Sequence, residues 1–142
     1  MTSQPLPSIP SPRWMTDLVN PVMLRLGLFP ALTVRGRRTG EPRTVPIGGP
    51  FAFEGSRYLV SGRGHTGWAR NLQAAGRGEL RTYGRIERFR AVEVIGAQRE
   101  RVIDAYRGAL GRSVAALFTA IPDPADHPVF RIEPDGGGAA AA

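Results

Sequence analysis

The sequence contains no cysteine, no lysine and only two histidines. Without cysteine, disulfide scaffolds and thiolate metal sites are excluded. His65 and His127 stand far apart in the chain and no HxH or HxxxH spacing occurs, so we expect no metal site. No apolar run approaches the roughly 18 residues that a membrane-spanning helix needs. These absences leave charge and glycine placement as the informative features.

The N-terminal stretch MTSQPLPSIPSPR lacks a basic segment followed by an apolar one, so it does not resemble a secretory signal. We therefore expect a cytoplasmic protein. The apolar segment 14–29 leaves an alternative open, in which it rests on the inner face of an anionic membrane as a peripheral contact. We favour the interpretation that this segment is a helix packed on the rest of the domain.

The formal net charge is +7, and every basic residue is an arginine. Such an excess indicates an anionic partner: nucleic acid, an acidic membrane surface or a phosphorylated cofactor. Four arginines (Arg35, Arg37, Arg38 and Arg43) flank one Thr-Gly-Glu-Pro turn. Guanidinium groups bind phosphate and carboxylate through paired hydrogen bonds. The turn is either a solvated hairpin end or an anion site, and the local sequence does not decide between them.

The length of 142 residues predicts one domain. We expect a flexible proline-rich arm over residues 1–12, a single domain over 13–134 and a low-complexity tail over 135–142. The chain is expected to be a monomer or a homodimer.

Short alternating segments bounded by glycine, proline and charged turns predict a mainly β domain with peripheral helices, an α+β fold built on a small barrel or a strongly curved sheet. One helix is predicted over Trp68–Ala75 and a long one over Gln98–Ala120, in which we expect glycines to introduce a bend. The predicted strands are Leu32–Gly36, Arg43–Ile47, Phe51–Phe53, Arg57–Ser61, Glu79–Tyr83, Ile86–Ile95 and Val129–Glu133.

A glycine-rich stretch, SGRGHTGWARNL, follows a predicted strand and leads into a predicted helix. Such a loop lets backbone amides approach a flat or anionic ligand, and the helix N-terminus adds positive potential. Trp68 serves either as a wall for a planar ring or as a core anchor, and we favour the anchor. Ser61 lacks the sequence context of a hydrolase triad.

A second basic stretch, RTYGRIERFR, predicts a hairpin with arginines along it. A solvated outer face is the favoured interpretation. Few aromatic residues are interleaved and no recognition-helix motif is present, so we expect no nucleic-acid partner.

Several of these motifs together resemble a known family. The run GRRTGEPRTVPI, followed by RYLVSGRG, WARNLQAAG, ELRTYGRIERFRAVEV and HPVFRIEP, is similar to the deazaflavin-dependent nitroreductases and quinone reductases, which are actinobacterial enzymes that use reduced coenzyme F420. The resemblance covers roughly residues 22–134 and implies a split β-barrel related to FMN-binding barrels. It also implies that F420, whose tail carries a phosphate and several glutamates, is the anionic partner.

The resemblance assigns site residues by matching position. Arg37, Arg38 and Arg43 would contact the phosphate and carboxylates of the tail. The residues assigned beside the deazaflavin or its linker are Thr44, Val45, Pro46, Ser61, Gly62, Arg63, Gly64 and Trp68, with Asn71 bracing the helix.

The implied reaction is hydride transfer from reduced deazaflavin to a quinone, a nitro-aromatic compound or an activated enone. Ser61 is the candidate catalytic residue, as a group that orients the acceptor or its proton. Two alternatives remain at this point. One is a non-catalytic barrel that carries F420, a flavin or a lipid, and the other is an enzyme of the same shape that uses FMN.

Overall fold

The computed structural model describes residues 6–10 and 30–135. Within them a seven-stranded antiparallel sheet runs in the order β2-β1-β5-β6-β7-β4-β3. The predicted apolar helix over residues 14–29 lies outside the described residues. The strands are β1 (Ala31–Arg35), β2 (Pro42–Pro46), β3 (Phe51–Phe53), β4 (Ser56–Val60), β5 (Arg77–Thr82), β6 (Arg85–Val94) and β7 (Val129–Pro134).

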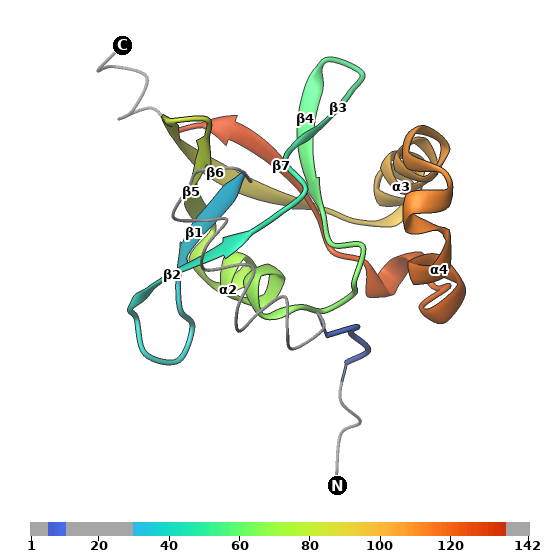
Figure 1. Ribbon diagram of the computed structural model, residues 1–142, viewed down its shortest axis with the longest axis horizontal. Helices are drawn as coiled ribbons and strands as arrows, with labels where there is room; N and C mark the ends of the chain where they lie inside the picture. The colour runs from blue at the N-terminus through green and yellow to red at the C-terminus, as the bar shows by residue number, and fades with distance from the viewer. Residues whose placement is uncertain (1–5, 11–29, 136–142) are drawn as a thin grey trace, which may run out of the picture.

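The long strand β6 joins two halves of the sheet. Its first part pairs with β5, from Arg85 opposite Thr82 to Arg90 opposite Arg77. Its second part pairs with β7, from Phe89 opposite Pro134 to Val94 opposite Val129. Because one strand serves both halves, the sheet curves around an interior while β2 and β3 remain its two edges (Figure 1). The predicted mainly β fold with peripheral helices is confirmed.

Two apolar clusters fill this curved sheet. In the first, α2 (Gly67–Ala75) packs Ala69 and Leu72 against buried residues of β1, β5 and β6. In the second, α3 (Gly96–Leu110) and α4 (Arg112–Ala120) cover β3, β4 and β7, with Phe118 of α4 among the buried residues. Figure 1 shows α3 and α4 together on one side of the sheet and α2 below it, beside β1 and β2.

The long helix predicted over Gln98–Ala120 is divided in two. Gly111 separates α3 from α4 and has a φ of 52° and a ψ of −123°. This left-handed conformation suits glycine because other residues place their Cβ against the backbone there. The break turns α4 so that Val114 and Phe118 reach the second cluster. The shorter predicted helix, Trp68–Ala75, matches α2 within one residue.

Residues 6–10 lie along the glycine-rich loop. The Ile9 amide donates to the Arg63 carbonyl at 2.8 Å, and the His65 amide donates to the Pro7 carbonyl at 2.9 Å. Ser8 and Gly64 form an isolated β-bridge between these bonds. This part of the arm that we expected to be flexible is therefore hydrogen bonded to the domain, and the proposed domain limits stay a prediction.

Candidate functional site

A pocket of about 350 Å³ opens between the β1–β2 turn and the start of α2. In Figure 1 this turn extends at the lower left, next to α2. The floor of the pocket is apolar, and its rim carries guanidinium, hydroxyl and amide groups. The lining residues are Leu32, Val34, Gly36, Arg37, Arg38, Thr39, Arg43, Val45, Gly67, Trp68 and Asn71.

The rim arginines have no acidic partner within the described residues. None of the ion pairs there includes Arg37, Arg38, Arg43 or the nearby Arg70. Elsewhere on the surface arginines are paired with carboxylates, as Arg57, Arg77, Arg88, Arg90, Arg101 and Arg131 are. These four arginines therefore leave uncompensated positive charge at this pocket, where it favours an anion.

Arg37 is held by Asn71. The side-chain oxygen of Asn71 accepts from the Arg37 backbone amide at 3.1 Å and from the Arg37 guanidinium at 2.7 Å. Asn71 itself is buried in the pocket wall. Although Arg37 is exposed, desolvation by the neighbouring protein is the main cause that lowers its pKa, and repulsion by Arg70 and Arg38 adds to it. An arginine remains charged at neutral pH in spite of such a shift, so a ligand anion at this rim would relieve the repulsion.

Strand alternation divides the predicted residues of β2. Arg43 and Val45 line the pocket, whereas Thr44 and Pro46 do not. Successive side chains of a strand point to opposite faces of the sheet. Accordingly, the Thr44 hydroxyl lies 2.7 Å from the hydroxyl of Thr33 on β1, outside the pocket.

Trp68 is a core anchor that also reaches the pocket, and its role as a wall for a planar ring stays a prediction. It is half-buried, packs against the first core cluster and has its ring centroid 6.2 Å from that of Phe130 on β7. It also lines the pocket. Thr66 caps α2 by accepting from the Ala69 amide, which fixes the start of the helix that carries Trp68 and Asn71.

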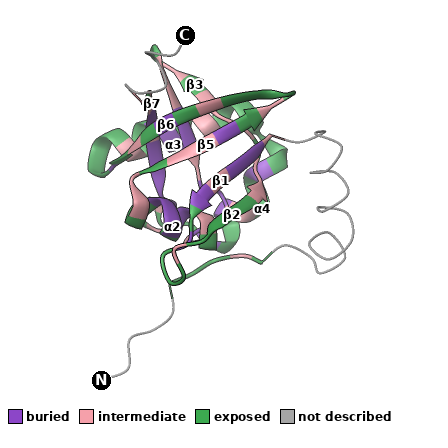
Figure 2. Cartoon of the chain, turned by 90° about the vertical axis from the view of Figure 1, so that its left-hand side faces the viewer, coloured by how far each residue is buried: buried purple, intermediate pink, exposed green. Residues whose placement is uncertain are grey.

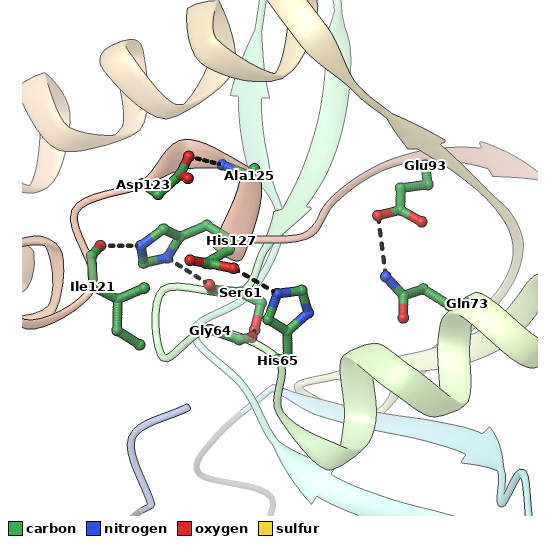
Figure 3. A network of polar contacts seen from close by, with 10 residues as sticks. Ser61, Gly64, His65, Gln73, Glu93, Ile121, Asp123, Ala125 and His127 are labelled. Carbon is green, nitrogen blue, oxygen red and sulfur yellow. Dashed lines mark hydrogen bonds and ion pairs between the residues drawn. The ribbon is translucent and has the colours of Figure 1, made fainter. Parts of the chain in front are cut away.

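The glycine-rich loop itself faces other parts of the protein. The Ser61 hydroxyl is buried and donates to the Gly64 carbonyl at 2.5 Å, and it lies 3.1 Å from the Thr66 hydroxyl. Figure 3 shows Ser61 and Gly64 beside His127, whose ring lies 3.1 Å from the Ser61 carbonyl and 2.6 Å from the Ile121 carbonyl. None of these groups lines the pocket.

Two further predicted loop residues also face the protein. A Cβ on Gly62 would lie 3.3 Å from Leu117 and 3.6 Å from the Tyr106 hydroxyl. The Arg63 guanidinium donates to the Pro10 carbonyl at 3.4 Å. The cofactor-binding roles predicted for Ser61, Gly62, Arg63 and Gly64 therefore stay predictions, and a direct contact with a pocket ligand would require the loop to rearrange.

The pocket also contains residues that the sequence did not single out. Leu32 and Val34 form its floor from β1, and Gly36, Thr39 and Gly67 complete its wall. Strand alternation gave a signal for two of them, because Leu32 and Val34 share a face of β1 and pair with Val45 and Arg43 of β2. The arginine-rich rim and the apolar floor suit a planar ring that carries a polyanionic tail.

Within the described residues, no helix is long and apolar enough to cross a membrane. In the same part of the chain, no three His, Cys, Asp or Glu side chains gather as a group suited to a metal ion.

Comparison with solved structures finds the same fold in proteins of low sequence identity. An F420-H2 dependent reductase, FDR-A, is 23% identical with a TM-score of 0.57 over 73% of this chain and 92% of that chain. A structure described as a domain-swapped dimer is 21% identical with a TM-score of 0.53 over 73% and 78%. HutZ, the heme storage protein of Vibrio cholerae, is 14% identical with a TM-score of 0.56 over 82% and 90%.

Comparison with curated proteins finds no match. The family described as F420H(2)-dependent quinone reductase matches residues 22–113, which is more than half of the chain and includes the whole pocket. The chain belongs to the F420H2-dependent quinone reductase family and is an F420-dependent reductase.

Proposed function

We propose that the pocket between the β1–β2 turn and α2 is the F420 site and that a quinone is the electron acceptor. The observation that supports this most strongly is the group of arginines on the rim of an apolar-floored pocket, which have no acidic partner in the part of the chain that the structure describes. In this proposal Arg37, Arg38 and Arg43 bind the phosphate and carboxylates of the tail. Val45 and Trp68 contact the ring system.

The chain contributes binding and orientation to the reaction. When bound, reduced F420 supplies the hydride, and a proton from water completes the reduction of the acceptor. Asn71 fixes the Arg37 guanidinium before the ligand arrives, which lowers the entropic cost of binding the tail. The half-buried face of Trp68 excludes water from one side of a planar ligand.

Ser61 remains the candidate for orienting the acceptor or its proton. Its hydroxyl already donates to the Gly64 carbonyl. A role toward the acceptor therefore requires that this bond breaks while the acceptor is bound, and Ser61→Ala tests it.

A first experiment measures cofactor binding by the quenching of tryptophan fluorescence. F420 is expected to bind more tightly than FMN, and its affinity is expected to fall as salt rises, because its tail is polyanionic. Equal or tighter binding of FMN would favour the FMN-using alternative. An affinity for F420 that does not change with salt would contradict the role of the arginines.

A second experiment tests the acceptor. Oxidation of reduced F420 is followed by absorbance with menadione, a nitro-aromatic compound and an activated enone as separate acceptors. We expect turnover with the quinone, and turnover with the other two would extend the acceptor class. Tight binding of F420 without turnover of any acceptor would favour a carrier protein. Light scattering on the same sample distinguishes a monomer from a homodimer.

A further inference from the structure

The hairpin between β5 and β6 ends in an unusual turn. Its two turn residues, Tyr83 and Gly84, have φ angles of 48° and 86°. A two-residue turn with both φ angles positive favours asparagine, aspartate or glycine at its first position. Tyrosine is sterically disfavoured at this position. Because Tyr83 is 78% exposed, burial within the described fold does not offset this cost.

The turn stands among apolar and cationic side chains. Ile86 is 59% exposed and lies directly opposite Arg81 in the β5–β6 register. Neither Arg81 nor Arg85 forms an ion pair within the described residues. Arg85 contributes to the lowered pKa of Glu87, but the main cause is the hydrogen bond from Arg57. The Glu87 carboxylate is therefore already paired with Arg57.

The remaining hairpin arginines differ from these two. Arg88 pairs with Glu79, and Arg90 pairs with Glu133. The positive charge is therefore neutralised along the strands and left free at the end of the hairpin. There it accompanies an aromatic and an aliphatic side chain that face solvent.

We propose that the end of this hairpin, residues 81–86, docks on an anionic lipid bilayer. Tyr83 and Ile86 enter the boundary between headgroups and acyl chains, where tyrosine is a preferred residue. Arg81 and Arg85 meet the lipid phosphates, to which each cation adds attraction.

The shape of the hairpin favours a membrane over a protein partner. Figure 2 shows the β5–β6 hairpin extending past the start of β1, with its end coloured as exposed. A stable protein interface buries about 1,200 Å² or more in total, which two protruding side chains do not supply. A bilayer needs only the tip. Docking would bring the enzyme close to quinones dissolved in the lipid. This benefit rests on the proposed function, whereas the docking itself does not.

The test is co-sedimentation of the full chain with vesicles of phosphatidylcholine, with and without phosphatidylglycerol. Binding is expected only to the vesicles that contain phosphatidylglycerol. The double variant Tyr83→Asn with Ile86→Thr suits the turn and the strand, so it should fold. Its partitioning is expected to fall about tenfold as apolar burial is lost. Arg85→Glu is expected to reduce partitioning about fivefold or more.

Arg112→Glu is the matched control. Arg112 begins α4, is exposed and has no ion pair within the described residues. Figure 1 shows α4 on the opposite side of the molecule from β5 and β6. This variant changes the net charge as Arg85→Glu does and should bind vesicles like the unaltered chain. An equal loss of vesicle binding in Arg85→Glu and Arg112→Glu would show that overall charge, not the hairpin, drives binding.

Three other results would overturn the proposal. One is no binding to anionic vesicles. Another is unchanged binding by the Tyr83→Asn and Ile86→Thr double variant, which would place the contact elsewhere in the chain. The third is self-association without vesicles that this variant abolishes, which would make the tip an interface between copies. F420 affinity should be unchanged in all hairpin variants, so failure here is distinguishable from failure of the proposed cofactor site.

Discussion

Arg37 and Arg38 are neighbours on the pocket rim, yet their replacement by alanine should have different consequences. Arg38 makes no hydrogen bond to another side chain and no ion pair within the described residues, so its charge is free for a ligand. Arg37 donates to the buried Asn71 through both its backbone and its guanidinium. Arg38→Ala should affect binding alone, and Arg37→Ala should affect both binding and folding.

The magnitudes follow from hydrogen-bond energetics. Loss of a charge-assisted contact costs about 1.5–3 kcal/mol, so Arg38→Ala should weaken F420 binding about 10- to 150-fold. Arg37→Ala should weaken binding by a similar factor. It also removes one of the two donors to the Asn71 oxygen, while the backbone donor remains. The added cost in unfolding free energy is therefore expected at the low end of the range for a lost buried partner, about 1 kcal/mol.

Two measurements on each variant separate these effects. F420 affinity is obtained by fluorescence titration at low and high salt, and the free energy of unfolding of the protein without cofactor by urea denaturation. Arg112→Ala, on the exposed start of α4, is the control and should change neither quantity. Equal destabilisation by Arg37→Ala and Arg38→Ala would refute the distinction drawn from Asn71. Unaltered F420 affinity in both variants would refute the proposed site.

Three more predictions concern residues outside the pocket. Gly64→Ala should lower the thermal unfolding temperature in a melting scan, because its Cβ would lie 2.4 Å from the Pro7 carbonyl at a φ of 90°; an unchanged temperature would argue against the packing of residues 6–10. Ser61→Ala should cost about 1 kcal/mol in urea denaturation, because the Gly64 carbonyl loses one of its two donors while the Thr66 amide still donates to it, and a fall in turnover beyond any loss of F420 affinity would support its catalytic role. The hydrogen bond from Arg57 holds the pKa of Glu87 below its ordinary value, so the stabilisation from this pair should be present above the unfolded carboxyl pKa of about 4.3 and be lost as the pH falls through the lower folded pKa. Because both groups are partly exposed, the free energies of unfolding of the unaltered chain and of Glu87→Gln, compared during acid titration, should differ by at most about 1 kcal/mol.

The sequence alone determined the local features of this protein. Positive charge at a Thr-Gly-Glu-Pro turn, period-two strands and a short helix after a glycine-rich loop are all set by neighbours in the chain. They sufficed to predict the α+β fold and to single out Arg37, Arg38, Arg43, Trp68 and Asn71, whereas Val45 was indicated by the family resemblance; all six line the pocket. The family motif added the coenzyme, because the identity of an anion is not encoded in charge alone.

Tertiary structure decided which glycines and polar groups line the pocket and which face other parts of the protein. Gly64 has the left-handed backbone typical of a ligand loop, but the chain that approaches it closely is residues 6–10. The Ser61 hydroxyl is used within its own loop. A close approach of backbone to backbone and a close approach of backbone to ligand demand the same residue, glycine, for the same steric reason. Only the long-range packing of the N-terminal residues and the sheet distinguishes the two.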